Sequence, residues 1–176
     1  MKSRTEKILV VLRVIAWIAM IGYAFNFGSQ VICLAISGIN PAASIKIPGV
    51  GQNLLNLLHY SFRYYWYAMF FVLALSAMFV YFWYLVITLF SKLSIRNPFT
   101  MEVSRKLDKI AYWLIAIWVV SGIGAIYITW LSSTTGEQLN ILKDTNDLLF
   151  TAGIVYIISQ IFKRGIEIQE ENEQTI

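Results

Sequence analysis

Four long runs of mostly apolar residues constrain this chain more than any other feature of its sequence. A helix needs about 20 consecutive apolar residues to cross the hydrocarbon core of a bilayer, and lipid offers no hydrogen-bond partner to an irregular backbone. The sequence therefore predicts an all-α integral membrane protein, an antiparallel four-helix bundle that forms a single membrane domain over residues 1–176. The predicted spans cover residues 8–36, 67–90, 110–131 and 148–163.

The composition agrees with lipid as the surrounding solvent. Mean hydropathy is +0.64, 58% of the residues are hydrophobic and only 14% are charged, which is too apolar for a water-facing globule. The fourth run is the shortest. It reaches spanning length only if Asp147 marks one membrane surface and Lys163 and Arg164 mark the other.

Basic residues predict which side of the membrane each loop occupies. When the four spans alternate in direction, all 14 lysine and arginine residues except Lys46, Arg63 and Lys143 fall on one side. Because cytoplasmic loops carry the excess of basic residues, we expect both termini to be cytoplasmic. The connecting segments are then an outer loop at 37–66, a cytoplasmic loop at 91–109 and a cytoplasmic tail at 164–176.

The residue types that catalysis and metal binding require are scarce. The chain has one histidine, His59, and one cysteine, Cys33, and it contains no Gly-rich phosphate loop, HExxH motif or nucleophile elbow. No ionisable residue lies near the centre of a predicted span, which disfavours a proton-coupled pump. We therefore expect no enzyme, no catalytic or metal site and no cofactor.

Neutral polar residues do occur inside the first predicted span. Asn26 and Gln30 are four residues apart and share one helix face. Their amides can hydrogen-bond to another span, as a structural clamp, or they can line a small intramembrane cavity. The small pairs Ala24 with Gly28, and Ser121 with Ala125, favour close helix packing. This spacing leaves open whether the packing is within the chain or in a homo-oligomer.

The segment between the second and third spans combines a helix start with positive charge. Asn97 and Pro98 are typical of the beginning of a helix, and Thr100 is an alternative N-cap with Glu102 near the positive end of the helix dipole. Val103, Leu107 and Ile110 form one apolar stripe. The charged residues around it are either an anchor to anionic lipid or a partner-docking surface. The basic docking candidates are Arg105, Lys106 and Lys109.

The C-terminal tail has the opposite charge. It can fold back on the basic loop, receive a basic partner, or remain a solvated helical end. Its acidic residues, which are candidates for partner docking, are Glu167, Glu170, Glu171 and Glu173.

Two segments carry a resemblance to a known family. The helix start "NPF", followed by "EVSRKLDKIAYWLI", and the closing "FKRGIEIQEENEQTI" resemble the bacterial membrane proteins catalogued as domain of unknown function 2975. The resemblance covers nearly the whole chain and implies a prokaryotic cytoplasmic membrane. It also implies a membrane partner for a helix-turn-helix regulator of the Cro/C1 type. The matching positions are Asn97, Pro98, Phe99 and Glu102 in the loop, and Gly165, Gln169, Glu170, Glu171, Asn172, Thr175 and Ile176 in the tail.

Two classes of function follow from the sequence. The first is an interaction protein whose loop and tail hold a DNA-binding regulator at the membrane, without binding nucleic acid itself. The second is a small-molecule binder or transporter subunit, with a pocket lined by Asn26, Gln30 and the aromatic residues of the second span.

Overall fold

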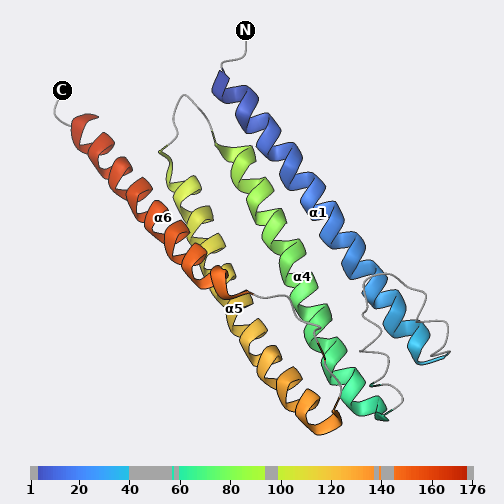
Figure 1. The fold of residues 1–176 in the computed structure, drawn as a ribbon. Coiled ribbons are helices and arrows are strands. Elements are labelled where there is room, and N and C mark those ends of the chain that lie inside the picture. The colour runs from blue at the N-terminus through green and yellow to red at the C-terminus, as the bar shows by residue number, and fades with distance from the viewer. Residues whose placement is uncertain are drawn as a thin grey trace. The chain divides into compact units, whose positions relative to one another are not determined.

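The structure is a computed structural model that describes residues 4–39, 57, 60–93, 99–136, 139 and 145–173. These residues form four α-helices and no strand, so the all-α prediction is confirmed (Figure 1). The helices are α1 (Arg4–Ser37), α4 (Phe62–Lys92), α5 (Met101–Thr135) and α6 (Asn146–Glu173).

All four helices are long and apolar enough to cross a membrane. Their candidate spanning segments contain 27 to 35 residues, which corresponds to about 40 to 50 Å at 1.5 Å per residue. The hydrocarbon core is about 30 Å thick. The chain is therefore a multi-pass membrane protein whose helices extend beyond the apolar runs that predict them.

Two helix ends show how the local sequence stops or starts a helix. α4 begins at Phe62, before the predicted start of the second span, so the aromatic segment ahead of residue 67 extends that helix. α5 ends at Thr135, and Gly136 follows with a left-handed φ of 74°. Its backbone N–H bonds to the Ser132 carbonyl oxygen at 2.9 Å, which is the usual way for glycine to close a helix.

Contacts divide the chain into two compact units. Unit 1 comprises Met1–Met20, Tyr81–Ala116 and Asn146–Ile176, and unit 2 comprises Ile21–Val80 and Ile117–Thr145. α6 and the first part of α1 both belong to unit 1.

Unit 1 packs α5 against α4 and α6 in antiparallel pairs. Tyr81 lies 4.7 Å from Trp113 between ring centroids, while the end of α4 meets the beginning of α5 through Lys92 and Glu102. Further along α5, the Tyr112 ring meets Tyr156 of α6. The buried core of unit 1 consists of Leu85, Leu89, Val103, Leu107, Ile110, Leu114 and Ala152.

Unit 2 packs α4 against α5 through both rings and aliphatic side chains. Tyr64 lies 5.9 Å from Trp130 and Phe71 lies 5.8 Å from Tyr127, so these helices are again antiparallel. Tyr23 of α1 stacks on Phe79 of α4 at 5.2 Å. The buried core of unit 2 consists of Leu57, Tyr65, Ala68, Met69, Ile128, Leu131 and Leu139.

Candidate functional site

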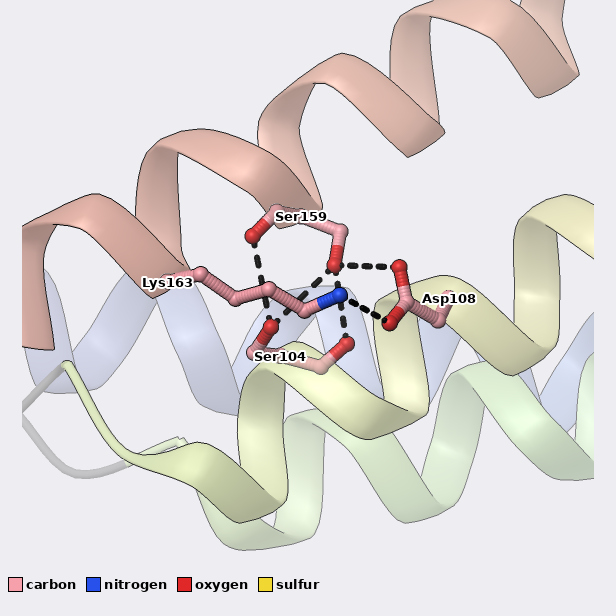
Figure 2. A network of polar contacts seen from close by, with 4 residues as sticks. All are labelled: Ser104, Asp108, Ser159 and Lys163. Atoms are coloured by element: carbon pink, nitrogen blue, oxygen red, sulfur yellow. Dashed lines mark hydrogen bonds and ion pairs between the residues drawn. The ribbon is translucent and has the colours of Figure 1, made fainter.

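A polar network with a buried serine pair joins α5 to α6 in unit 1 (Figure 2). Lys163 Nζ lies 2.8 Å from Asp108 Oδ2, and the Ser159 hydroxyl donates to Asp108 Oδ1 at 2.6 Å. Ser104 and Ser159 are fully buried. Each hydroxyl also lies near the main-chain carbonyl oxygen of the other serine, at 3.3 Å for Ser104 Oγ and 3.1 Å for Ser159 Oγ. Such reciprocal contacts require the two backbones to approach closely, which small residues permit.

This network was missed in the sequence analysis. Its signal is a pair of i, i+4 spacings, Ser104 with Asp108 and Ser159 with Lys163, each of which puts a small hydroxyl and a charge on one helix face. The opposite charges of Asp108 and Lys163 indicate that these two faces can meet. The run of apolar residues before Lys163 predicts only that this residue marks a membrane surface.

An aromatic contact fixes the beginning of α5 on α6 next to this network. The Phe99 ring lies 5.2 Å from the Phe162 ring. It also covers Gly165, where a Cβ atom would come within 2.8 Å of Phe99 Cδ1. Glycine at position 165 therefore allows the ring to reach the α6 backbone. Phe99 in the loop motif and Gly165 in the tail motif of the resemblance thus lie in contact.

The structure describes only part of the helix-start motif. α5 begins at Met101, and Thr100 acts as the N-cap, since its Oγ1 accepts a hydrogen bond from Val103 N at 3.4 Å. Glu102 lies in the first turn and pairs with Lys92 at 3.3 Å. Asn97 and Pro98 lie outside the described residues.

The three basic docking candidates differ in their surroundings. Arg105 is exposed and Lys106 is half-buried. Lys109 holds its ammonium group over the Tyr81 ring, 5.6 Å from the centroid, as a cation–π contact. Val103, Leu107 and Ile110 are all buried, so the predicted apolar stripe is confirmed. Arg105 and Lys109 are exposed, and Lys106 is partly covered.

The acidic tail continues α6 as a helix up to Glu173. Glu167, Glu170 and Glu171 are exposed, and the side chain of Glu173 lies outside the described part. Arg164 Nη1 contacts Glu167 Oε2 at 2.7 Å and Glu171 Oε1 at 4.0 Å. One arginine of the same helix thus offsets part of the acidity, while the carboxylates remain in contact with solvent.

The intramembrane amides bond to each other instead of reaching a second helix. Gln30 Nε2 donates to Asn26 Oδ1 at 2.6 Å. Gln30 is buried, and its Oε1 has no hydrogen-bond partner among the residues that the structure describes, whereas Asn26 is exposed. The predicted pair is therefore on one face, as its spacing indicates.

Four helices that are long and apolar enough to cross a membrane define the chain as a multi-pass α-helical membrane protein. Residues 37–176 match the family model described as "Protein of unknown function (DUF2975)". The chain belongs to that family. No curated protein and no solved structure matches the chain.

Proposed function

We propose that this membrane protein holds a soluble cytoplasmic regulator at the membrane through the exposed acidic end of α6. The observation that carries the proposal is the continuation of α6 as a helix through Glu167, Glu170 and Glu171, all of which are exposed. Arg105, near the beginning of the neighbouring helix α5, is also exposed.

The acidic residues favour a partner with a basic surface. A DNA-binding regulator has such a surface, because its lysine and arginine side chains neutralise DNA phosphates. Carboxylates on α6 would compete with DNA for those side chains and so keep the regulator off its target genes. The family resemblance, which implies a helix-turn-helix partner, agrees with this chemistry.

The contacts between α5 and α6 support docking on a rigid element. The ion pair of Lys163 with Asp108 and the ring of Phe99 over Gly165 hold α6 directly before its acidic end. A preformed surface loses less conformational entropy when a partner binds. The docking helix is therefore ordered before the regulator arrives.

Photo-crosslinking in the native host tests the proposal. Crosslinkers replace Lys106 on α5 and Gln169 on α6, and the control crosslinker replaces Ser133 near the end of α5 that the sequence places outside the cell. Recovery of one DNA-binding protein from positions 106 and 169, with none from position 133, is the expected result. Recovery of lipid and self-crosslinks alone would contradict the proposal and indicate that the charges anchor the protein to anionic lipid.

A further inference from the structure

α1 carries an amide pair whose hydrogen bonding is incomplete. Gln30 is only 5% exposed, and its Oε1 has no partner. Asn26 is exposed, and its only side-chain hydrogen bond among the described residues is the one that Oδ1 accepts from Gln30. The Nδ2 group of Asn26 thus presents its donors at the surface of a helix that crosses the membrane.

An amide donor without a partner is unfavourable in free energy at the depth where Asn26 lies. The predicted span ends at Ile36, and ten residues of helix correspond to about 15 Å, which is half of a hydrocarbon core of about 30 Å. Asn26 therefore lies near the middle of the bilayer, where acyl chains offer no hydrogen-bond partner. A polar group of another molecule must satisfy the amide.

We propose that the Gly22–Asn26 face of α1 binds the same face of a second copy of this chain, with the two Asn26 amides hydrogen-bonded to each other. An amide side chain is self-complementary, because it carries both donors and an acceptor. Asn26 Oδ1 keeps a second lone pair after it accepts from Gln30. Two copies related by a twofold axis can therefore exchange N–H···O bonds between identical residues.

The surroundings of Asn26 allow the close approach that such bonds require. Gly22 lies one turn before Asn26, is exposed, and would have nothing within 4 Å of an added Cβ atom. A second helix can therefore come near the backbone at this position. Only 6% of the most apolar stretch of α1 is buried, so the remainder of the chain leaves this helix open to a neighbour.

The first experiment measures self-association of the purified full-length protein in lipid bilayers by energy transfer between labelled copies. Asn26→Leu keeps the size of the side chain and removes the amide. We expect it to weaken dimerisation about tenfold, which is the order of effect of one or two interhelical hydrogen bonds in a membrane. The control, Val31→Leu, changes an exposed residue on the opposite side of α1 and should leave the dimer unchanged. A monomeric wild type, or an Asn26→Leu dimer as tight as the wild type, would overturn the proposal, and a monomer would point to a small polar ligand instead.

The second experiment identifies the face and does not require removal of the amide. In a Cys33→Ala background, single cysteines replace Gly22 or Ala24, two small exposed residues on nearly opposite faces of α1. Oxidation should join copies through Gly22→Cys and not through Ala24→Cys. Crosslinking through Ala24→Cys alone would overturn the proposal and assign the contact to the Ala24 and Gly28 face.

Discussion

The two units of this protein both use ring contacts between helices, but they differ in the polar contacts that accompany them. In unit 1, where every ion pair between described residues lies, a buried network of serines and opposite charges joins α5 to α6. In unit 2, rings of α4 and α5 pack against each other, as in Tyr64 with Trp130. Lipid is as apolar as the side chains it surrounds, so burial of apolar surface does little to drive helix association inside it.

This difference indicates which unit determines the register of its helices more strictly. Hydrogen bonds and ion pairs depend on distance and angle, so a shift of one residue between α5 and α6 would break the contacts of Ser159. Rings tolerate several mutual orientations, and the ring pairs of unit 2 range from 21° to 81° between planes. We therefore expect substitutions in the network of unit 1 to be less well tolerated than those in the rings of unit 2.

The largest expected effect comes from filling the close contact in unit 1. Ser159→Leu places a large side chain between two backbones and should lower the free energy of unfolding by about 3 kcal/mol, measured by denaturant titration in detergent micelles. The control is Thr151→Leu, at an exposed position of the same helix, which should change stability little. Equal effects of the two substitutions would contradict the close approach at Ser159.

A smaller effect should come from the glycine under Phe99. Gly165→Ala should cost about 1 kcal/mol, because the Phe99 ring must move and this outweighs the gain of up to about 1 kcal/mol that alanine brings to a helix. Gly153→Ala in the same helix has nothing within 4 Å of the new Cβ and should be stabilising. The opposite signs in thermal unfolding are the test, and a stabilising Gly165→Ala would show that the ring does not pack there.

In unit 2 we expect removal of a hydroxyl to be tolerated or even favourable. Tyr127 contacts several rings, while its buried hydroxyl has no hydrogen-bond partner. Tyr127→Phe keeps the ring and removes the unpaired group, so it should stabilise the protein by about 0.5 to 1 kcal/mol. A loss of stability in the same denaturant titration would mean that a polar contact also holds unit 2 together, and the contrast between the units would fail.

The smallest expected effect on stability lies at the exposed end of α6. Glutamines in place of Glu167, Glu170 and Glu171 should leave the unfolding midpoint unchanged, because surface ion pairs contribute little. Binding of the proposed regulator should fall sharply, and Asp147→Asn at the other end of the same helix should not affect it. Co-purification of the regulator with each variant is the measurement, and unchanged recovery with the triple variant would rule out docking through these carboxylates.

Much of the fold could be predicted because hydropathy and helix length follow directly from lipid as solvent. The four spans follow from the length of the apolar runs, and the apolar stripe of Val103, Leu107 and Ile110 follows from helical spacing. The sequence predicts the start of α5 at either Asn97–Pro98 or Thr100, since several residues nearby favour an N-cap. The structure assigns that role to Thr100, because the helix begins directly after it.

The candidate site could be predicted only in part. The acidic and basic residues are visible as charge runs, but pairing between helices depends on which turns meet in space. Ser104 and Ser159 are 55 positions apart. Their i, i+4 spacings to Asp108 and Lys163 can be read from the sequence, but the sequence does not show which turns of α5 and α6 meet. The contact of Phe99 with Gly165 could not be predicted for the same reason. The cytoplasmic orientation of both termini and the role of the docking residues stay predictions.

The unbroken course of α6 has a geometric consequence for its acidic end. A helix turns by about 100° for each residue and rises by about 1.5 Å. If α6 shifted by one residue along α5 and turned to keep a side chain in the contact, its carboxylates would rotate by about 100° relative to α5. The contacts of Ser159 and Lys163 forbid that shift. They therefore fix the side of α6 on which Glu167, Glu170 and Glu171 lie relative to α5.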